Sequence, residues 1–291
     1  MPPDTPPIGE NQQCQDAQPP FDAEARDFTN ALARLGVRRG DTILVHSSYK
    51  SPGRVKGGPD GVIAGLEAAI GKEGTLVMPT LCQVDFFNSY KTWYRDKPSD
   101  VGYLTEYFRK LPYVYRSDHA THSAAARGKN AYFLTCEHGA HGPHPCPFGE
   151  YAFADSSPWM KMYALGAKIV FLGTTMAANT MKHVVEARYV ESVLAQVADP
   201  GRRDALRGEL VAFGRFVGKD GIWPMYDGLL MQAELERRGL VRRTTCGKAA
   251  ILCVEMKESC DAALEILRAD PDRWCNKPTA DWIRRAMGTR A

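Results

Sequence analysis

The sequence lacks the hydrophobic segments that mark membrane and exported proteins. No window of 18 or more residues is apolar throughout, so we expect no membrane-spanning helix. The opening segment MPPDTPPIGENQQCQDAQPP has neither a basic start nor an apolar stretch, which argues against a secretory signal. Its proline and glutamine content predicts a flexible N-terminal tail over residues 1–20, followed by one domain over residues 21–291. We therefore expect a cytoplasmic protein with no membrane partner.

Close cysteine pairs and a strong excess of charge are also missing. The eight cysteines include no C-x-x-C pair, so we expect reduced thiols. Cys246, Cys253 and Cys260 lie seven residues apart, but their turn-like and strand-like contexts give them no common face for a metal. The 37 basic and 34 acidic residues leave a net charge of +3, which is too small to favour nucleic acid as a partner.

Several catalytic signatures are absent as well. The chain has no G-x-G-x-x-G and no Walker segment, which argues against a Rossmann dinucleotide site and a P-loop kinase. It has no H-E-x-x-H, so a metalloprotease is not supported. The segment HGAHGPH places His138, His141 and His144 three residues apart, but glycine and proline predict a loop without helical register. We predict no metal site and leave this histidine cluster open.

Apolar strands and amphipathic helices alternate along the chain. This order is the signature of βαβ units and predicts a single α/β domain with a mainly parallel central sheet flanked by helices. The predicted strands are Thr42–His46, GTLVMPT, AKIVFLG and GKAAILCVEM. The predicted helices are FDAEARDFTNALARL, GVIAGLEAAIG with Asp60 as its N-cap, LTEYFRKLP, SPWMKMYALG, a helix from about Asn179, YDGLLMQAELERRGL and SCDAALEILRADPDRW.

The segment VHSSYKSPGRVKGG follows the carboxyl end of the first predicted strand. In open α/β sheets, ligands bind beyond these strand ends. Small hydroxyl residues, the Gly57–Gly58 pair and a helix start offer backbone N–H groups to an anion, and Lys50, Arg54 and Lys56 add positive charge. The segment predicts an anion-binding loop, with a plain turn between strand and helix as the alternative.

The segment GTTMAANTMKHVVEARY places Thr180, His183 and Glu186 three residues apart. In a helix these side chains spread over about a third of the circumference. An imidazole is suited to accept a proton near neutral pH, and a carboxylate on its other nitrogen fixes its tautomer. We expect Thr180 to hydrogen-bond the remaining nitrogen or a substrate. The alternative is a polar stripe at an exposed helix end.

Two further segments carry polar groups. RSDHATHS holds His119, His122 and Ser123, and His119 and Ser123 belong to the same site if this stretch adjoins the other strands. Residues 81–102 are aromatic, polar and aperiodic, and a loop of this length in a compact domain is usually functional. Ordinary surface polarity is the alternative for the histidines.

Five segments follow one another along the chain: VHSSYKSPGRVKGG, GTLVMPT, RSDHATHSAAARG, PFGEYAFADSSPWMKMYALGAKIVFLG and NTMKHVVEARY. Together they resemble the aminoglycoside 3-N-acetyltransferase family, over roughly residues 21–275. The family commonly has HP where this chain has His119-Ala120. The resemblance implies the antibiotic N-acetyltransferase fold, which differs from that of Gcn5-related acetyltransferases, and transfer of an acetyl group from acetyl-CoA to an amine.

The resemblance also implies the binding and catalytic residues. In the family, the HSS loop and the following glycine pair hold the pantetheine and phosphates of the cofactor. The implied cofactor contacts here are Ser47, Ser48, Tyr49, Val55, Gly57 and Gly58, with Thr75 and Ser123 as further contacts. The motif NT-x-x-H-x-x-E maps onto Thr180, His183 and Glu186, with His183 as the base and Glu186 as its orienting group. Direct transfer requires no metal.

The expected acceptor is a small-molecule amine, and Asp85, Tyr90 and His119 are its expected contacts. Aminoglycosides are polycations, whereas this chain is slightly basic, and residues 81–102 balance their acids against Lys91, Arg95 and Lys97. Family members outside resistance acetylate other amines. The acceptor is therefore an aminoglycoside or related amino sugar, or a biosynthetic amine such as an aminophosphonate or nucleotide-linked amine.

Two other function classes stay open. A hydrolase would use Ser47 or Ser123 as its nucleophile, and an inactive module would bind CoA without transferring an acetyl group. A homodimeric state is also left open.

Overall fold

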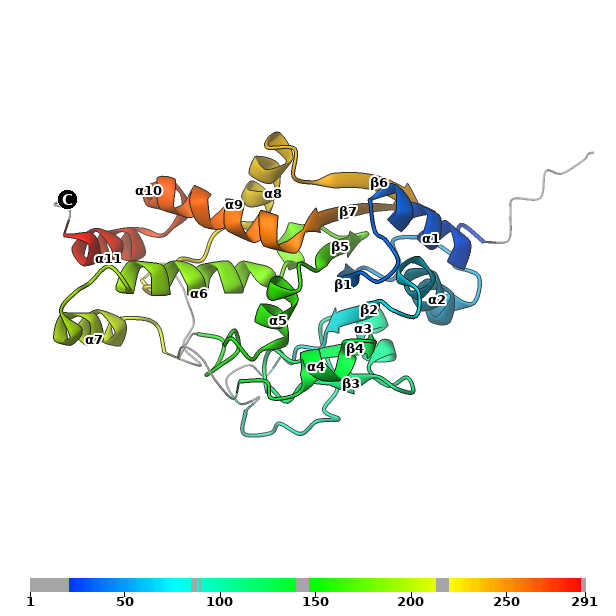
Figure 1. The fold of residues 1–291 in the computed structure, drawn as a ribbon, viewed down its shortest axis with the longest axis horizontal. Helices are drawn as coiled ribbons and strands as arrows, with labels where there is room; N and C mark the ends of the chain where they lie inside the picture. Colours follow the sequence, from blue (N-terminus) through cyan, green and yellow to red (C-terminus); the bar gives the residue numbers. More distant parts are fainter. Residues whose placement is uncertain (1–20, 85–87, 89, 140–146, 213–219, 289–291) are drawn as a thin grey trace, which may run out of the picture.

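The structure, a computed structural model, describes residues 21–84, 88, 90–139, 147–212 and 220–288. A seven-stranded sheet forms its centre, in the order β3-β4-β2-β1-β5-β7-β6 (Figure 1). The strands are β1 (Thr42–Ser47), β2 (Thr75–Pro79), β3 (Tyr115–Arg116), β4 (Ala124–Gly128), β5 (Lys168–Leu172), β6 (Arg242–Cys246) and β7 (Ala249–Glu255). The tail predicted over residues 1–20 lies outside the described residues.

Helices cover both faces of the sheet and extend beyond one end of it (Figure 1). They are α1 (Ala25–Arg34), α2 (Gly58–Ile70), α3 (Tyr103–Phe108), α4 (Ala131–Thr135), α5 (Pro158–Ala164), the 3-10 turn η1 (Met176–Ala178), α6 (Met181–Leu194), α7 (Pro200–Gly208), α8 (Gly228–Arg237), α9 (Met256–Ala269), α10 (Pro271–Trp274) and α11 (Lys277–Met287). None of the helices in the described ranges is long and apolar enough to cross a bilayer.

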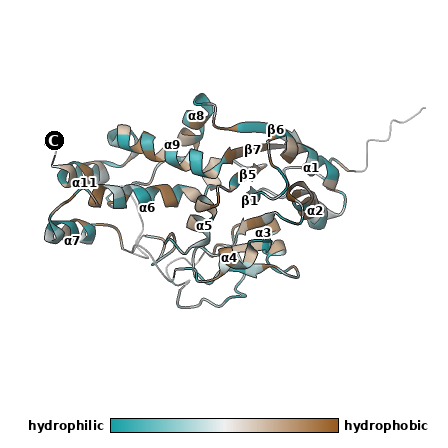
Figure 2. Ribbon diagram, viewed as in Figure 1, coloured by the Kyte–Doolittle hydropathy of each residue, from teal (hydrophilic) through white to brown (hydrophobic). Residues whose placement is uncertain are grey.

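The central strands alternate their side chains between two hydrophobic cores. On β1, Ile43 and Val45 pack with α1 and α2, whereas Leu44 packs on the opposite face with α5, α6 and α9. Side chains of a strand alternate with a period of two, so a strand covered on both faces is apolar along its whole length. Figure 2 shows the contrast with the edge: β7 is hydrophobic, whereas the edge strand β6 is hydrophilic.

The predicted single α/β domain is confirmed, and its parallel part comprises β2, β1 and β5. The outer pairs β3–β4, β4–β2, β5–β7 and β7–β6 are antiparallel, so the sheet as a whole is mixed. A short connection without a crossover helix joins β3 to β4 and β6 to β7, and strands joined in this way pair antiparallel.

Two helix starts differ from the prediction. Gly57, at φ 79°, is the N-cap of α2, and Asp60 lies within the first turn rather than at the cap. The reason is that the turn before α2 needs the left-handed conformation that glycine adopts without steric cost. The helix expected from about Asn179 begins at Met181, after the turn η1.

The chain changes direction across the sheet at β1. It passes from β1 through α2 to β2 on one side, and later places β5 on the other side of β1. The carboxyl ends of β1 and β5 therefore meet at a topological switch point, where open α/β sheets bind ligands. Ser48 N–H donates to Leu172 O across these ends at 2.8 Å, and Ser51 Oγ donates to Gly173 O at 3.0 Å.

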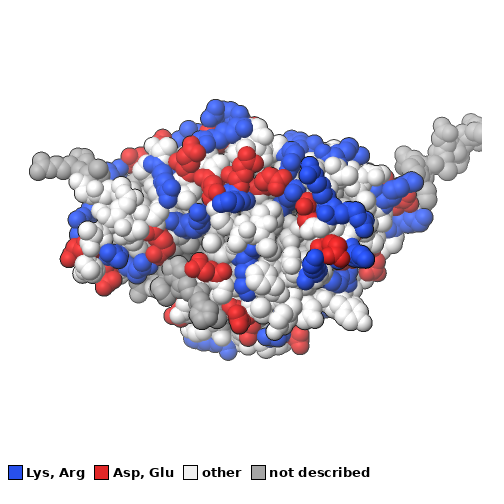
Figure 3. Space-filling model, in the orientation of Figure 1, with Lys and Arg blue, Asp and Glu red and all other residues white. Residues whose placement is uncertain are grey.

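Charged side chains of both signs are interspersed on the face shown in Figure 3. Among the described residues, charged side chains form ion pairs such as Arg243 with Glu236 at 2.8 Å and Arg237 with Glu234 at 2.6 Å. This face therefore carries no field of a single sign, in keeping with the small net charge of the chain.

Candidate active site

His183 and Glu186 form a hydrogen-bonded pair on the first turns of α6. His183 Nδ1 lies 2.8 Å from Glu186 Oε2, and the Glu186 side chain is completely buried. A carboxylate oxygen can only accept, so the proton of the imidazole lies on Nδ1 and the lone pair lies on Nε2. The i, i+3 spacing read from the sequence therefore brings these two groups together as expected.

Trp223 and Lys182 complete the surroundings of the Glu186 carboxylate. Trp223 Nε1 donates to Oε2 at 3.0 Å, and Lys182 Nζ lies 3.9 Å from Oε1. Burial, together with the negative charge of Glu186, holds the pKa of Tyr226 well above its ordinary value. Sequence reasoning missed Trp223, because it lies in none of the motif segments and is 37 residues away from Glu186 along the chain.

Aromatic rings enclose the imidazole of His183. The Phe148 ring centroid lies 3.9 Å from that of His183, and those of Phe153 and His122 each lie 5.8 Å away. His122 meets the His183 ring edge-on. These rings limit the rotation of His183, so the imidazole is held by packing as well as by Glu186.

A cavity of about 350 Å³ opens at His183 and at the carboxyl end of β1. Ser47 and Thr180 line it, as do Leu81, Gln83 and Val101 of the loop that follows β2. Thr180 lies at the start of α6 without a side-chain hydrogen bond to the helix, and its only bond to His183 within the described chain is from His183 N–H to Thr180 O at 3.1 Å, between main-chain atoms. The structure thus brings Thr180 to the same cavity as His183 but not into direct contact with its ring nitrogens.

His46, the first residue of the HSS sequence, also lines this cavity. It is 4% exposed, its ring stacks on Phe171, and burial lowers its pKa to about 3. His46 is therefore neutral at pH 7.

The predicted cofactor loop surrounds the start of α2. Gly57 and Gly58 have φ of 79° and 58°, and a Cβ on Gly58 would lie 3.5 Å from the Tyr49 hydroxyl. Val55 is buried and forms a parallel bridge with Ala23, which holds the loop against the start of the domain. Glycine backbone at the N-terminus of a 13-residue helix fits a phosphate group.

Thr75 is not part of this site. It opens β2, pairs with Thr42 at the amino ends of the strands, and is completely buried with its Oγ1 accepting from Asn130 N–H at 2.9 Å. The segment GTLVMPT has a threonine at each end, and the cavity lies at the other end, where Pro79 and Leu81 line it. The structure therefore does not support Thr75 as a cofactor contact.

Ser123 is completely buried, and its hydroxyl is engaged within the sheet. Its Oγ donates to Thr80 O at 2.8 Å and accepts from Arg116 Nε at 3.1 Å. No hydrogen bond joins Ser123 or Ser47 to a histidine among the residues that the structure covers. The geometry therefore gives the hydrolase alternative no nucleophile that is activated by a base.

The three expected acceptor contacts have different outcomes. Asp85 lies outside the described residues. Tyr90 is half exposed, with Lys91 over its ring, and is not among the residues that line the cavity. His119 uses both ring nitrogens within the protein, since Nε2 donates to Glu150 O at 3.0 Å and Nδ1 accepts from His122 N–H at 3.0 Å.

A buried arginine holds residues 95–97 of the loop that follows β2. Arg116 is 8% exposed and donates to the carbonyl oxygens of Arg95 at 2.8 Å, Lys97 at 2.5 Å and Thr80 at 2.7 Å. Its guanidinium also lies over the Trp93 ring, 4.8 Å from the centroid. The loop is therefore tied to the sheet through its own backbone.

His119, His122 and His138 form a cluster beside the site. The rings of His119 and His138 stack 4.6 Å apart, and His138 bonds Ser117 Oγ at 2.8 Å and Ala152 O at 3.2 Å. Burial lowers the pKa of His119 to about 4 and holds those of His122 and His138 well below the ordinary value. No group of three or more His, Cys, Asp or Glu side chains in the described chain is arranged so that it could hold a metal ion, and His141 and His144 lie outside the described residues.

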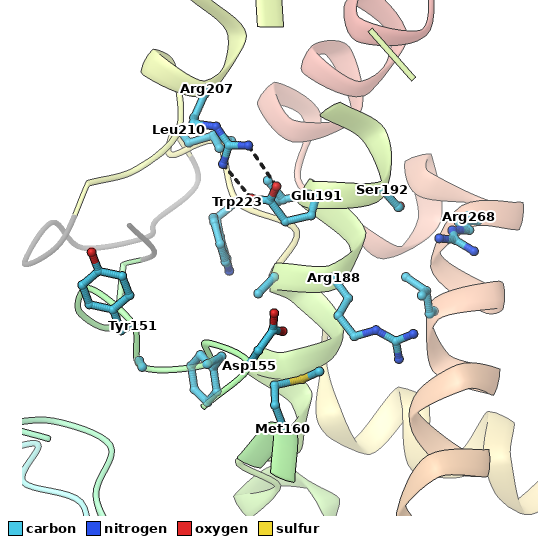
Figure 4. A pocket seen from close by; sticks show the side chains of 15 residues that line it. Tyr151, Asp155, Met160, Arg188, Glu191, Ser192, Arg207, Leu210, Trp223 and Arg268 are labelled. Atoms are coloured by element: carbon cyan, nitrogen blue, oxygen red, sulfur yellow. Dashed lines mark hydrogen bonds and ion pairs between the residues drawn. The ribbon is translucent and has the colours of Figure 1, made fainter. Parts of the chain in front are cut away.

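A second cavity, also of about 350 Å³, lies farther along α6 (Figure 4). Trp223 and Phe153 line it, as does the ion pair of Glu191 with Arg207 at 2.6 Å. Trp223 therefore borders this cavity and contacts Glu186 at the same time.

The comparisons with known proteins identify the family and the fold of the chain. The model of the family described as aminoglycoside 3-N-acetyltransferase matches residues 44–268. The chain is 35% identical over 160 residues to aminoglycoside N(3)-acetyltransferase IV of a Salmonella species, covering 55% of this chain and 57% of the relative. It is 29% identical over 189 residues to the aminoglycoside N(3')-acetyltransferase-like protein YokD of Bacillus subtilis, covering 58% of this chain and 66% of the relative.

The chain thus spans about three fifths of the length of the curated relatives it matches. Among solved structures, it is similar to the apoenzyme of aminoglycoside acetyltransferase AAC(3)-IVa, with a TM-score of 0.67 and 25% identity over 94% of this chain and 100% of that one. The chain belongs to the aminoglycoside 3-N-acetyltransferase family.

Proposed function

We propose that this protein is an N-acetyltransferase that moves the acetyl group of acetyl-CoA directly onto an amine of a small molecule. The observation that carries the proposal is the hydrogen-bonded His183–Glu186 pair at a cavity that Ser47 also lines. Family membership supports the same reaction. A neighbour in fold, AAC-IIIb, was solved as a binary complex with CoASH; it is 20% identical, with a TM-score of 0.66, and the match covers 87% of this chain and 98% of that one.

His183 is the proposed general base. Acetyl-CoA supplies a thioester carbonyl for the amine to attack, so that a C–N bond forms as the C–S bond breaks. The Nε2 lone pair of His183 takes the proton that the amine must lose, and Glu186 holds the ring and stabilises the imidazolium. The proton then passes from His183 to the leaving thiolate, which returns the base to its starting state.

The HSS loop is the proposed cofactor-binding element. Ser47 lines the cavity at His183, Ser48 and Tyr49 follow it directly in the chain, and the Val55–Gly58 turn leads into α2. The helix N-terminus and the glycine backbone suit the phosphates, and the cavity suits the pantetheine arm that must reach His183.

The proposed acceptor is an aminoglycoside or related amino sugar, or another small amine such as an aminophosphonate or nucleotide-linked amine. A variant of AAC(3)-IVa, 26% identical with a TM-score of 0.62, was solved in complex with apramycin. Among the described residues that line the cavity at His183, none is Asp or Glu. A polycationic acceptor is therefore not favoured by the described lining alone.

The test is thiol release from acetyl-CoA across a panel of amines, covering aminoglycosides, amino sugars, aminophosphonates and nucleotide-linked amines. We expect turnover with at least one class, and a rise in melting temperature on addition of acetyl-CoA. An absence of acetyl-CoA binding would reject the proposal. Binding without transfer to any amine would support the inactive module instead, and ester hydrolysis without CoA that Ser47→Ala abolishes would favour the hydrolase.

A further inference from the structure

We propose that Trp223 is a positioning residue for the reaction, because its indole N–H fixes the carboxylate that orients His183. The inference rests on the proposed function and concerns a residue outside the motif segments. Trp223 Nε1 donates to Glu186 Oε2 at 3.0 Å, and His183 Nδ1 lies 2.8 Å from the same oxygen. Two donors from distant parts of the chain thus converge on one carboxylate oxygen.

The two donors define the orientation of the carboxylate. Glu186 is completely buried, and its Oε1 has no hydrogen bond within the described part of the chain. The nearest cation to Oε1 is Lys182, whose Nζ at 3.9 Å is too far for a hydrogen bond. Rotation of the carboxylate would therefore move Oε2 away from its two donors, His183 and Trp223. Because this rotation breaks the hydrogen bond from the indole N–H, Trp223 opposes it.

Trp223 is itself held firmly by the C-terminal helix. Trp223 N–H donates to Thr279 Oγ1 at 2.9 Å, and Thr279 Oγ1 donates to Trp223 O at 3.1 Å. The indole is 2% exposed, and Thr279 lies on α11. The position of the donor is therefore set by the two hydrogen bonds between Trp223 and Thr279.

The other titratable groups that face Glu186 are Lys182, Tyr226 and Cys275. Burial and the charge of Glu186 raise the pKa of Cys275 to about 12 and hold that of Tyr226 well above the ordinary value. Both groups are therefore neutral at pH 7 and do not replace a lost donor with a cation. The effect of removing the indole N–H is thus expected to fall on the His183–Glu186 pair.

The experiment compares Trp223→Phe with Trp282→Phe in thiol release from acetyl-CoA, with the best amine as acceptor. Trp282 is the matched control, because it is 1% exposed on α11 and its Nε1 donates to Leu206 O at 3.0 Å, away from Glu186. We expect Trp223→Phe to lower kcat about 10-fold to 100-fold with KM for acetyl-CoA within about 2-fold. Trp282→Phe is expected to lower the melting temperature with kcat within about 2-fold of the parent.

The pH profile separates positioning from mere loss of structure. A carboxylate that has lost a donor holds a proton on His183 more strongly, so the acid limb of the kcat profile moves to higher pH in Trp223→Phe and not in Trp282→Phe. Trp223→Phe added to Glu186→Gln is expected to cost less than about 2-fold more, because the effect passes through Glu186. Equal kcat losses for the two tryptophan variants, or additive losses with Glu186→Gln, would overturn the proposal.

If Trp223→Phe does not fold, an analogue of tryptophan that differs only at the indole N–H provides the test. Trp223→β-(3-benzothienyl)alanine keeps the shape of the indole and removes only the N–H donor, and the same loss of kcat is expected. Independently of activity, the indole proton resonance of Trp223 is expected to move upfield in Glu186→Gln, while that of Trp282 stays in place. A parent enzyme without transferase activity would reject the proposed function, whereas an active parent with an unmoved Trp223 resonance would reject this inference alone.

Discussion

Two adjoining regions of this protein are rich in histidine, and they differ in what surrounds the rings. His183 lies beside a carboxylate and at a cavity, whereas His119, His122 and His138 contact hydroxyl groups, carbonyl oxygens and one another. Burial depresses the pKa of each ring in the cluster. A buried imidazole becomes suited to proton transfer when an anion faces one nitrogen and a substrate can reach the other.

Removal of the His183 imidazole is expected to have the largest effect. His183→Ala should lower kcat by about 10²-fold to 10⁴-fold, because the amine then loses its proton without a positioned base. Acetyl-CoA binding, measured by the rise in melting temperature, should stay close to that of the parent. Near parental turnover by a folded variant would show that the base is not His183.

Glu186→Gln tests the partner that distinguishes His183 from the cluster. The amide keeps the shape of the side chain but removes the charge that stabilises the imidazolium, so we expect kcat to fall about 10²-fold. The assay is thiol release under saturating acetyl-CoA, with Glu191→Gln on the same helix as the control for loss of a carboxylate. A loss no larger than that of the control would contradict the role of Glu186.

The histidine cluster is expected to make stability depend on pH. The pKa of folded His119 lies at about 4, below its ordinary value of 6.5, so the unfolded chain binds more protons between these pH values. The contribution of neutral His119 to the free energy of unfolding is complete above about pH 6.5 and is lost as the pH falls toward 4. The free energy of unfolding is measured with urea at pH 7 and at pH 5. Between these two pH values, we expect the free energy of unfolding of His119→Asn to fall by about 2 kcal/mol less than that of the parent. Equal losses would argue against a depressed pKa at His119.

His138→Ala should leave the chemistry intact and weaken the fold. It removes the partners of Ser117 Oγ and Ala152 O, so we expect a loss of about 1 to 2 kcal/mol in the free energy of unfolding. The value of kcat should stay within about 2-fold of the parent, in contrast to His183→Ala. A large fall in kcat without a change in stability would show that the histidine cluster takes part in catalysis.

The parts of the molecule that could be predicted are those whose structure is indicated by their own residues and spacing. Strands β1, β2, β5 and β7 are apolar because helices or neighbouring strands bury them, and each was expected from its composition. The edge strand β6, with the sequence RRTTC, has mostly exposed side chains and no such signal. Its strand conformation comes from pairing with β7, which composition does not report.

The same division holds for the site. His183 and Glu186 are one helical turn apart, so their contact follows from spacing once the segment is helical. Trp223 contacts Glu186 through tertiary packing, and no sequence pattern near Trp223 predicts that contact. Thr75 was assigned to the cofactor site by resemblance, but the direction of β2 places it at the far end of the strand.

The three carbonyl oxygens that accept from Arg116 belong to the main chain, and a carbonyl is present whatever side chain a residue carries. The hydrogen bonds that hold residues 95–97 therefore do not depend on which side chains these residues carry. Substitutions of the side chains at residues 95–97 can change the surface of the loop while its backbone keeps its course.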